Sequence, residues 1–151
     1  MGTNYYLLTK NKETAKKLAP YSYKLTDKPY FAYEIHLAKT SCGWLPLFQA
    51  HREGISSVDD IRNVYNLRDV ELFNEYGERV FWATFEAGVL HHNGGIAGVA
   101  PRERYDKTSK YADMDMPDYL PVSHFDYGRG KYASHYFKDK EGYEFTYDDF
   151  S

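Results

Sequence analysis

This chain of 151 residues contains a single cysteine, Cys42, only six prolines and no long run of apolar residues. One cysteine excludes an internal disulfide and any zinc site built from several thiolates. No apolar stretch approaches the roughly 20 residues that a membrane-spanning helix needs. The N-terminus also lacks a charged segment followed by an apolar one, so we expect no secretory signal. These absences predict a soluble cytoplasmic protein with no membrane partner.

A strong net charge is missing as well. The formal net charge is −3, which is too small for a nucleic-acid mimic and has the wrong sign for a general DNA coat. The charge is nevertheless uneven, with six lysines from Lys10 to Lys28 and an excess of acids from Asp106 to Ser151. This pattern suits two solvated faces, or a dipolar protein that docks one face against a partner. Direct binding of DNA or RNA by the lysine-rich segment would depend steeply on salt.

Aromatic residues, by contrast, are abundant, with 16 Tyr and 9 Phe. Tyrosine suits the half-buried positions of small sheets, and it also provides rigid contact area at protein interfaces and for stacking on bases. Half of the tyrosines lie at or beyond Tyr105, which is more than a core of that length requires. We therefore predict a partner-binding surface in this part of the chain, with five contact residues: Tyr105, Tyr111, Tyr119, Tyr127 and Tyr132.

The spacing of apolar residues predicts an α+β fold, with an antiparallel or mixed sheet of about five to six strands and two to three short helices. Three strands are expected at residues 3–9, 30–38 and 44–50. Because proline cannot donate to a strand ladder, Pro46 suggests that the third of these is an edge strand or contains a bulge.

Local capping signals predict where the helices begin. Asn11 can cap a short helix that ends at Pro20, and residues 21–29 should then form a loop. Ser57 opens a Ser-x-x-acid sequence that is typical of a second helix start. A third short helix is expected at residues 82–90.

A weak internal repeat links two distant segments. Asn74 and Gly77 follow an apolar residue with the same spacing as Asp139 and Gly142. Each copy predicts a strand, a glycine turn and a second strand, so we expect the C-terminal hairpin to join the same sheet.

We expect a single domain over residues 1–151, divided into a core at 1–90 and a loop- and tyrosine-rich extension at 91–151 that ends in the hairpin. Residues 91–121 contain several glycines and prolines and show no apolar period. A loop of this length in a compact domain is usually functional or mobile.

The segment from Glu34 to Trp44 delivers a cation and two hydroxyl groups to a Gly-Trp turn. Such groups can hold a phosphate or carboxylate through charge-assisted hydrogen bonds, and a tryptophan can stack on a base. The same residues also suit a tight strand connection whose hydroxyls satisfy backbone groups. The predicted ligand-binding residues are His36, Lys39, Thr40, Ser41 and Trp44.

Two segments, Gly2-Thr3-Asn4-Tyr5-Tyr6 and the His36–Trp44 turn, resemble a family of small phage-encoded proteins. That family carries a GTNYY start and an HxGKSSxGW-like core, and the resemblance covers about residues 2–90. Ala38 stands where the family has glycine. The family has no assigned activity, so the resemblance implies a phage product that acts in the cytoplasm of the host cell.

Other spacings predict no catalytic residue, no metal and no cofactor. The adjacent His91 and His92 point in different directions on any regular backbone, and no histidine pair has zinc spacing. The acids from Asp113 to Asp118 do not follow the calcium-loop pattern. Cys42 lies six residues after His36, but no third group can be named that would orient a thiol–imidazole pair.

We therefore expect a non-enzymatic phage accessory protein that binds and inhibits a host protein, most concretely an anti-defence inhibitor of a bacterial immune system. The alternative is a small-ligand protein, either a nucleotide sponge or a phosphate-directed enzyme, that uses the His36–Trp44 turn. Nucleotides should stabilise the protein under the small-ligand hypothesis and not under the inhibitor hypothesis.

Overall fold

The computed structural model describes residues 2–41, 44–91, 123–124 and 135–150. The five tyrosines predicted to contact a partner, Tyr105, Tyr111, Tyr119, Tyr127 and Tyr132, lie outside the described residues. So do Cys42 and nearly all of the loop predicted at 91–121.

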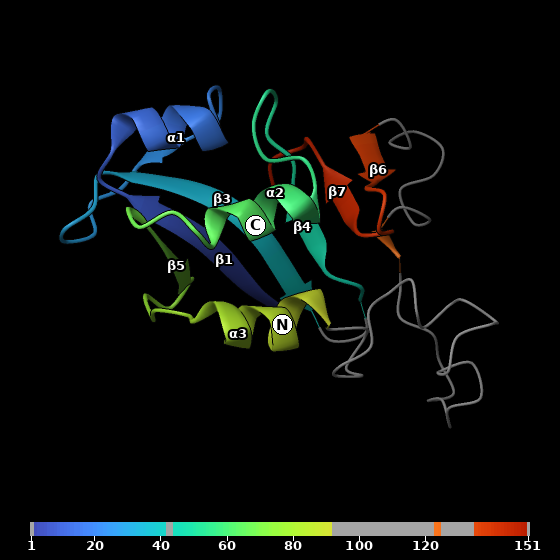
Figure 1. The fold of residues 1–151 in the computed structure, drawn as a ribbon. Coiled ribbons are helices and arrows are strands. Elements are labelled where there is room, and N and C mark those ends of the chain that lie inside the picture. Colours follow the sequence, from blue (N-terminus) through green and yellow to red (C-terminus); the bar gives the residue numbers. More distant parts are fainter. Residues whose placement is uncertain (1, 42–43, 92–122, 125–134, 151) are drawn as a thin grey trace.

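The strands form one mixed sheet in the order β5-β1-β3-β4-β7-β6, with β2 paired to β3 beside that path (Figure 1). All pairs are antiparallel except β4 and β7, which are parallel. The predicted α+β class is confirmed, with one strand more than predicted. The seven strands are β1 (Gly2–Thr9), β2 (Lys24–Leu25), β3 (Tyr33–Ser41), β4 (Leu47–Gln49), β5 (Val70–Asn74), β6 (Tyr136–Lys138) and β7 (Glu144–Thr146).

Two strands differ from the sequence prediction. The additional strand β2 lies in the segment predicted as a loop, and both of its residues are exposed, so burial left no periodic signal there. The edge position predicted for β4 is wrong, because β4 lies between β3 and β7. Pro46 immediately precedes β4, where its missing N–H removes no ladder hydrogen bond.

The helices begin at the predicted caps. Asn11 accepts a hydrogen bond from the Glu13 N–H at the start of α1 (Lys12–Leu18). Ser57 accepts one from the Asp60 N–H at the start of α2 (Val58–Val64). The predicted third helix is α3 (Trp82–Phe85), which continues into the π-helical turn η1 (Glu86–Leu90).

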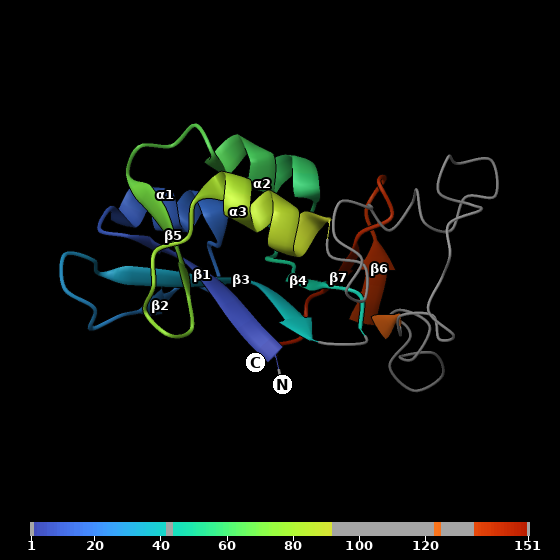
Figure 2. The ribbon, with the colours of Figure 1, turned by 90° about the horizontal axis from the view of Figure 1, so that it is seen from below.

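The three α-helices cover one face of the sheet, and the C-terminal end of the chain lies on the other face (Figure 2). The core lies between the sheet and the helices, where fully buried strand residues meet apolar helix residues. Burial of each Leu, Ile, Val or Phe side chain in this core stabilises the fold by about 1.5–3 kcal/mol. The central members are Leu7, Ile35, Leu37, Phe48 and Leu72 from the sheet and Ala15, Ile61, Phe85 and Leu90 from the helices.

The two turns of the internal repeat are confirmed at the level of individual hydrogen bonds, but the second strand predicted after Gly77 is wrong, because only an isolated bridge joins Phe73 to Arg79. Asn74 Oδ1 accepts from the backbone N–H groups two and four residues later, at 3.0 and 3.0 Å. Asp139 Oδ1 accepts from the equivalent two groups, at 3.0 and 2.9 Å. Gly77 and Gly142 both have positive φ, 79° and 90°, in the left-handed region that favours glycine. A side-chain oxygen of Asn or Asp and a glycine with positive φ therefore close both turns in the same way.

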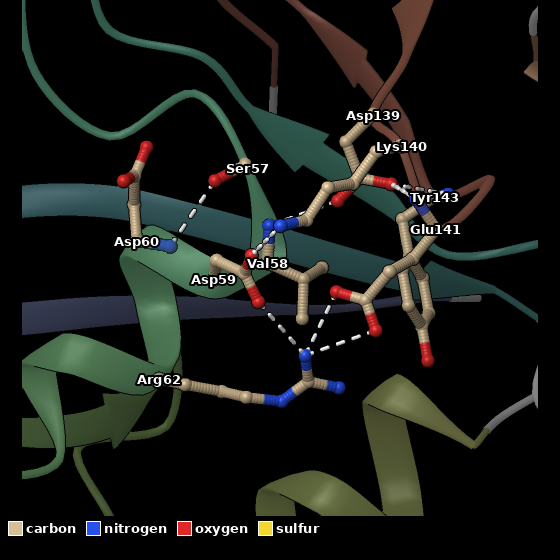
Figure 3. A network of polar contacts seen from close by, with 9 residues as sticks. All are labelled: Ser57, Val58, Asp59, Asp60, Arg62, Asp139, Lys140, Glu141 and Tyr143. Atoms are coloured by element: carbon tan, nitrogen blue, oxygen red, sulfur yellow. Dashed lines mark hydrogen bonds and ion pairs between the residues drawn. The ribbon is translucent and has the colours of Figure 1, made fainter.

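A polar network fastens the C-terminal hairpin to the start of α2 (Figure 3). The second oxygen of Asp139 accepts the Val58 N–H at 2.9 Å. Arg62 donates to both oxygens of Glu141, at 3.0 and 2.8 Å, and Lys140 pairs with Asp59. The hairpin is thus held both by β4 and by a helix terminus.

Candidate functional site

A cleft of about 930 Å³ lies beside the middle of β3, between residues 21–24 and the C-terminal residues. Because it is built around His36, we call it the His36 cleft. Phe150, near the C-terminal end, contacts the His36 ring with 4.6 Å between ring centroids. Five aromatic side chains line the cleft: Tyr6, Tyr21, Tyr23, Tyr147 and Phe150.

His36 forms part of the cleft floor, and its two ring nitrogens are both engaged. Nδ1 lies 3.2 Å from Gln49 Oε1, and Nε2 lies 2.9 Å from Asn4 Oδ1. The Gln49 amide nitrogen donates to the carbonyls of Thr146 and Asp148, at 3.1 and 2.9 Å, which fixes the Gln49 oxygen toward the ring. A neutral ring can donate from only one nitrogen. Nδ1 therefore carries the proton, and the Asn4 amide is turned over so that its NH₂ group, in place of Oδ1, donates to Nε2.

Burial keeps this imidazole neutral. It lowers the pKa of His36 to about 4, although the hydrogen bond to Gln49 opposes the shift. The Tyr6 ring packs on the other side, with 5.1 Å between centroids. Burial, and then the Glu34, Glu75 and Asp149 carboxylates, raise the pKa of Tyr6. His36 is therefore a neutral, fully hydrogen-bonded part of the floor at pH 7.

His51 lies next to His36 and is only 2% exposed. Its Nε2 is 2.8 Å from the His36 carbonyl oxygen and must donate to it, so Nδ1 is left to accept from the Ser22 hydroxyl. Burial lowers the pKa of His51. The pair has the hydrogen bond of an activated serine, and both residues line the cleft. The bonds of His51 to Ser22 and to the His36 carbonyl also hold residues 21–24 against the sheet.

The rim of the cleft is charged and solvent-exposed. Lys24 and Asp149 form an exposed ion pair at 3.4 Å. The Arg52 guanidinium lies 5.0 Å from the centre of the Tyr147 ring, within cation–π range. Tyr21, which is 72% exposed, donates its hydroxyl hydrogen to Glu53 at 2.6 Å. The rim therefore offers both signs of charge beside aromatic surface.

The structure separates His36 from the other predicted ligand residues, none of which lines the cleft. Lys39 and Ser41 lie beside β1, where a Cβ added to Gly2 would be 2.9 Å from Lys39 Cε and 2.6 Å from Ser41 Oγ. The Thr40 side chain is hydrogen-bonded to Tyr5.

Trp44 lies outside the cleft as well. It stacks on His124, with 4.6 Å between centroids, and burial lowers the pKa of His124 to about 4. Of the five predicted residues, His36 alone lies in the cleft.

Comparison with protein-family models, with curated proteins and with solved structures found no match to this chain. In the part of the chain that the structure describes, no helix is long and apolar enough to cross a bilayer. Nor do three or more His, Cys, Asp or Glu side chains gather there as they would around a metal ion.

Proposed function

We propose that this chain is a non-enzymatic binding protein and that the His36 cleft recognises a segment of a partner protein. The observation that carries this proposal is the composition of the cleft, which has five aromatic side chains around a floor of paired polar groups. Tyrosine and arginine dominate the binding energy of protein interfaces. Tyr21, Tyr147 and Arg52 are all exposed at the rim, where a partner can reach them.

The hydrogen bonds among the buried polar groups of the cleft floor favour binding over catalysis. His36 and His51 are neutral and hydrogen-bonded through both ring nitrogens. His36 could accept a proton from a bound molecule only if its bond to Asn4 were broken first. Satisfied buried polar groups instead make a rigid surface, which lowers the entropy cost of binding.

The biological role we propose for this binding is inhibition of a host component, most concretely in bacterial defence against phage. The support for this role is the resemblance of residues 2–90 to phage proteins. In this account the tyrosine-rich extension at 91–151 enlarges the partner surface, and the protein acts in the host cytoplasm.

Affinity capture from bacterial lysate tests the proposal. The immobilised wild-type protein should retain a specific protein that the double variant Tyr21→Ala/Arg52→Ala loses. Tyr76→Ala is the matched control, because Tyr76 is also an exposed tyrosine, at 67%, but lies outside the cleft. Equal capture by the wild type and the cleft variant would reject the cleft as the partner site.

A second set of variants tests the extension. Replacing Tyr105, Tyr111, Tyr119 and Tyr127 together by alanine should weaken capture further. Unchanged capture would remove the extension from the proposed surface.

A small-ligand function remains the second candidate, because the volume of the cleft lies in the range of small-molecule sites, about 300–1,000 Å³. In this case a mono-, di- or cyclic nucleotide should raise the melting temperature of the protein. Arg52→Ala should abolish the shift if the ligand lies in the cleft, and Lys39→Ala should abolish it if the ligand lies at the predicted turn. The absence of any shift across the panel would reject this function.

A further inference from the structure

A second hollow, of about 590 Å³, lies where the chain leaves β1, between the loop at residues 28–31 and β5. We call it the Tyr30 groove. It shares no lining residue with the His36 cleft. Three aromatic and three basic side chains line it: Tyr30, Phe31, Phe73, Lys10, Lys28 and Arg68.

Tyr30 has a backbone conformation that its side chain disfavours. Its φ is 71°, in the left-handed region where a bulky residue is an outlier and glycine is not. The side chain is 90% exposed, so burial provides no compensating stability. The backbone strain at Tyr30 is not offset by burial of its ring, which indicates that the ring serves binding and not stability.

The wall beside Tyr30 is ordered by contacts within the groove. Phe31 meets Phe73 edge-to-face, with 5.5 Å between ring centroids. Lys28 Nζ lies 5.7 Å from the centre of the Phe73 ring. The groove therefore offers a preformed aromatic surface with a cation above it.

Two acids, Asp69 and Glu71, also line the groove, and each is bonded to a residue outside the lining. Asp69 accepts from the Thr14 hydroxyl, and Glu71 pairs with Arg79 at 3.5 Å. In the adjacent turn, Glu75 accepts the backbone N–H of β1 residue Asn4, and Glu78 accepts from the side chain of Asn74.

The basic side chains of the groove form no ion pair within the described ranges. Across the described ranges, no carboxylate lies within ion-pair distance of Lys10, Lys28 or Arg68. The groove thus combines cations that have no acidic partner in those ranges with aromatic rings. This combination complements a phosphate next to a flat base.

We propose that the Tyr30 groove binds single-stranded nucleic acid. A base stacks on Tyr30, and the flanking phosphates contact Lys10, Lys28 and Arg68. This inference goes beyond the proposed partner recognition and uses a separate surface, so either one can fail alone.

The test is fluorescence anisotropy of the whole protein with labelled 15-nucleotide dT and rU strands at low salt. The wild type should bind both strands, and added salt should weaken the binding. Tyr30→Ala should weaken it at least about fivefold, as loss of one base stack does. Lys28→Gln and Arg68→Gln should each reduce the slope of log affinity against log salt by about 0.7.

Two further variants control for folding and for general loss of aromatic surface. Tyr30→Gly should weaken binding as much as Tyr30→Ala while leaving the melting temperature equal or higher, because glycine tolerates the positive φ. Tyr21→Ala removes a comparably exposed tyrosine from the His36 cleft and should bind as the wild type does.

Three results would overturn the inference. They are an absence of oligonucleotide binding at low salt, wild-type affinity in both Tyr30 variants, and binding of free UMP or TMP as tight as that of the 15-nucleotide strands. The last would assign the groove to a mononucleotide.

Discussion

His36 occupies the floor of the cleft as a neutral imidazole, and this makes the stability of the fold depend on pH. Its pKa is about 4 in the folded chain against 6.5 for an unperturbed histidine. Between these values the unfolded chain binds more protons than the folded one. The contribution of His36 is therefore complete above pH 6.5 and is lost as the pH falls toward 4.

We expect the free energy of unfolding to fall by about 1–3 kcal/mol from this group between pH 7 and pH 4. His124, whose pKa is also lowered to about 4, acts in the same direction. Urea unfolding at several pH values measures the effect. The variant His36→Gln should lose stability less steeply in this window, whereas the surface variant Tyr76→Ala should keep the wild-type slope. A wild-type slope in His36→Gln would contradict the assignment.

Gly54 supports the loop that carries His51 because a backbone approaches it closely. A Cβ at this position would lie 2.1 Å from the Leu18 carbonyl oxygen. Since both the loop and α1 would have to move, Gly54→Ala should lower the free energy of unfolding by about 3 kcal/mol.

Gly88 provides the matched control for this prediction. An added Cβ there meets nothing within 4 Å, and the residue is helical. Gly88→Ala should therefore be neutral or stabilise the protein by up to about 1 kcal/mol. Chemical denaturation of both variants measures these changes. Equal changes in the free energy of unfolding for Gly54→Ala and Gly88→Ala would contradict the prediction.

At the scale of elements, the two repeated turns differ in one atom that matters. The second oxygen of Asp139 accepts the Val58 N–H, whereas the equivalent atom of Asn74 is an amide nitrogen that donates to Glu78. The first turn is therefore a purely local structure. The second also joins the hairpin to α2.

This difference gives a graded prediction for Asp139. Asp139→Asn keeps the turn, as Asn74 demonstrates, but brings two donors together at Val58 and should cost about 1–2 kcal/mol. Asp139→Ala removes three acceptor contacts and should cost about 3 kcal/mol. Lys140→Ala, at the neighbouring exposed residue, should change little. Thermal unfolding of the three variants tests the order, and equal losses for Asn and Ala would contradict it.

The elements that the sequence predicts well are those fixed by local chemistry. Asn11 and Ser57 cap helices through bonds to residues two and three positions away, and the Asn74 and Asp139 turns close within four residues. The position of β4 was mispredicted because it depends on β7, about 97 residues further along the chain. A proline before a strand cannot show which neighbours the strand will have.

At the scale of the whole molecule, the His36 cleft is assembled from five separate parts of the chain. Tyr6, residues 21–24, β3, residues 49–52 and the C-terminal residues meet only in the folded protein. The sequence indicated His36 because it lies in a conspicuous motif. It gave no sign of His51, whose partner Ser22 is 29 residues away.

The motif that singled out His36 lies mostly on one strand, β3. Lys39, Thr40 and Ser41 continue along β3, and neither they nor Trp44 line the cleft. Long-range contacts of the C-terminal residues, such as Phe150 against His36, complete the cleft. No local pattern encodes such contacts.

The central claim is that the His36 cleft is a recognition surface, and site-specific photo-crosslinking tests it most directly. A photoreactive phenylalanine analogue replaces Tyr21 in the cleft or, as the control, the exposed Ala87 on η1. After irradiation of bacterial cells that produce the protein, the analogue at Tyr21 should yield one discrete crosslinked protein that is missing at Ala87. Crosslinks that are absent at Tyr21, or identical at both positions, would contradict the account.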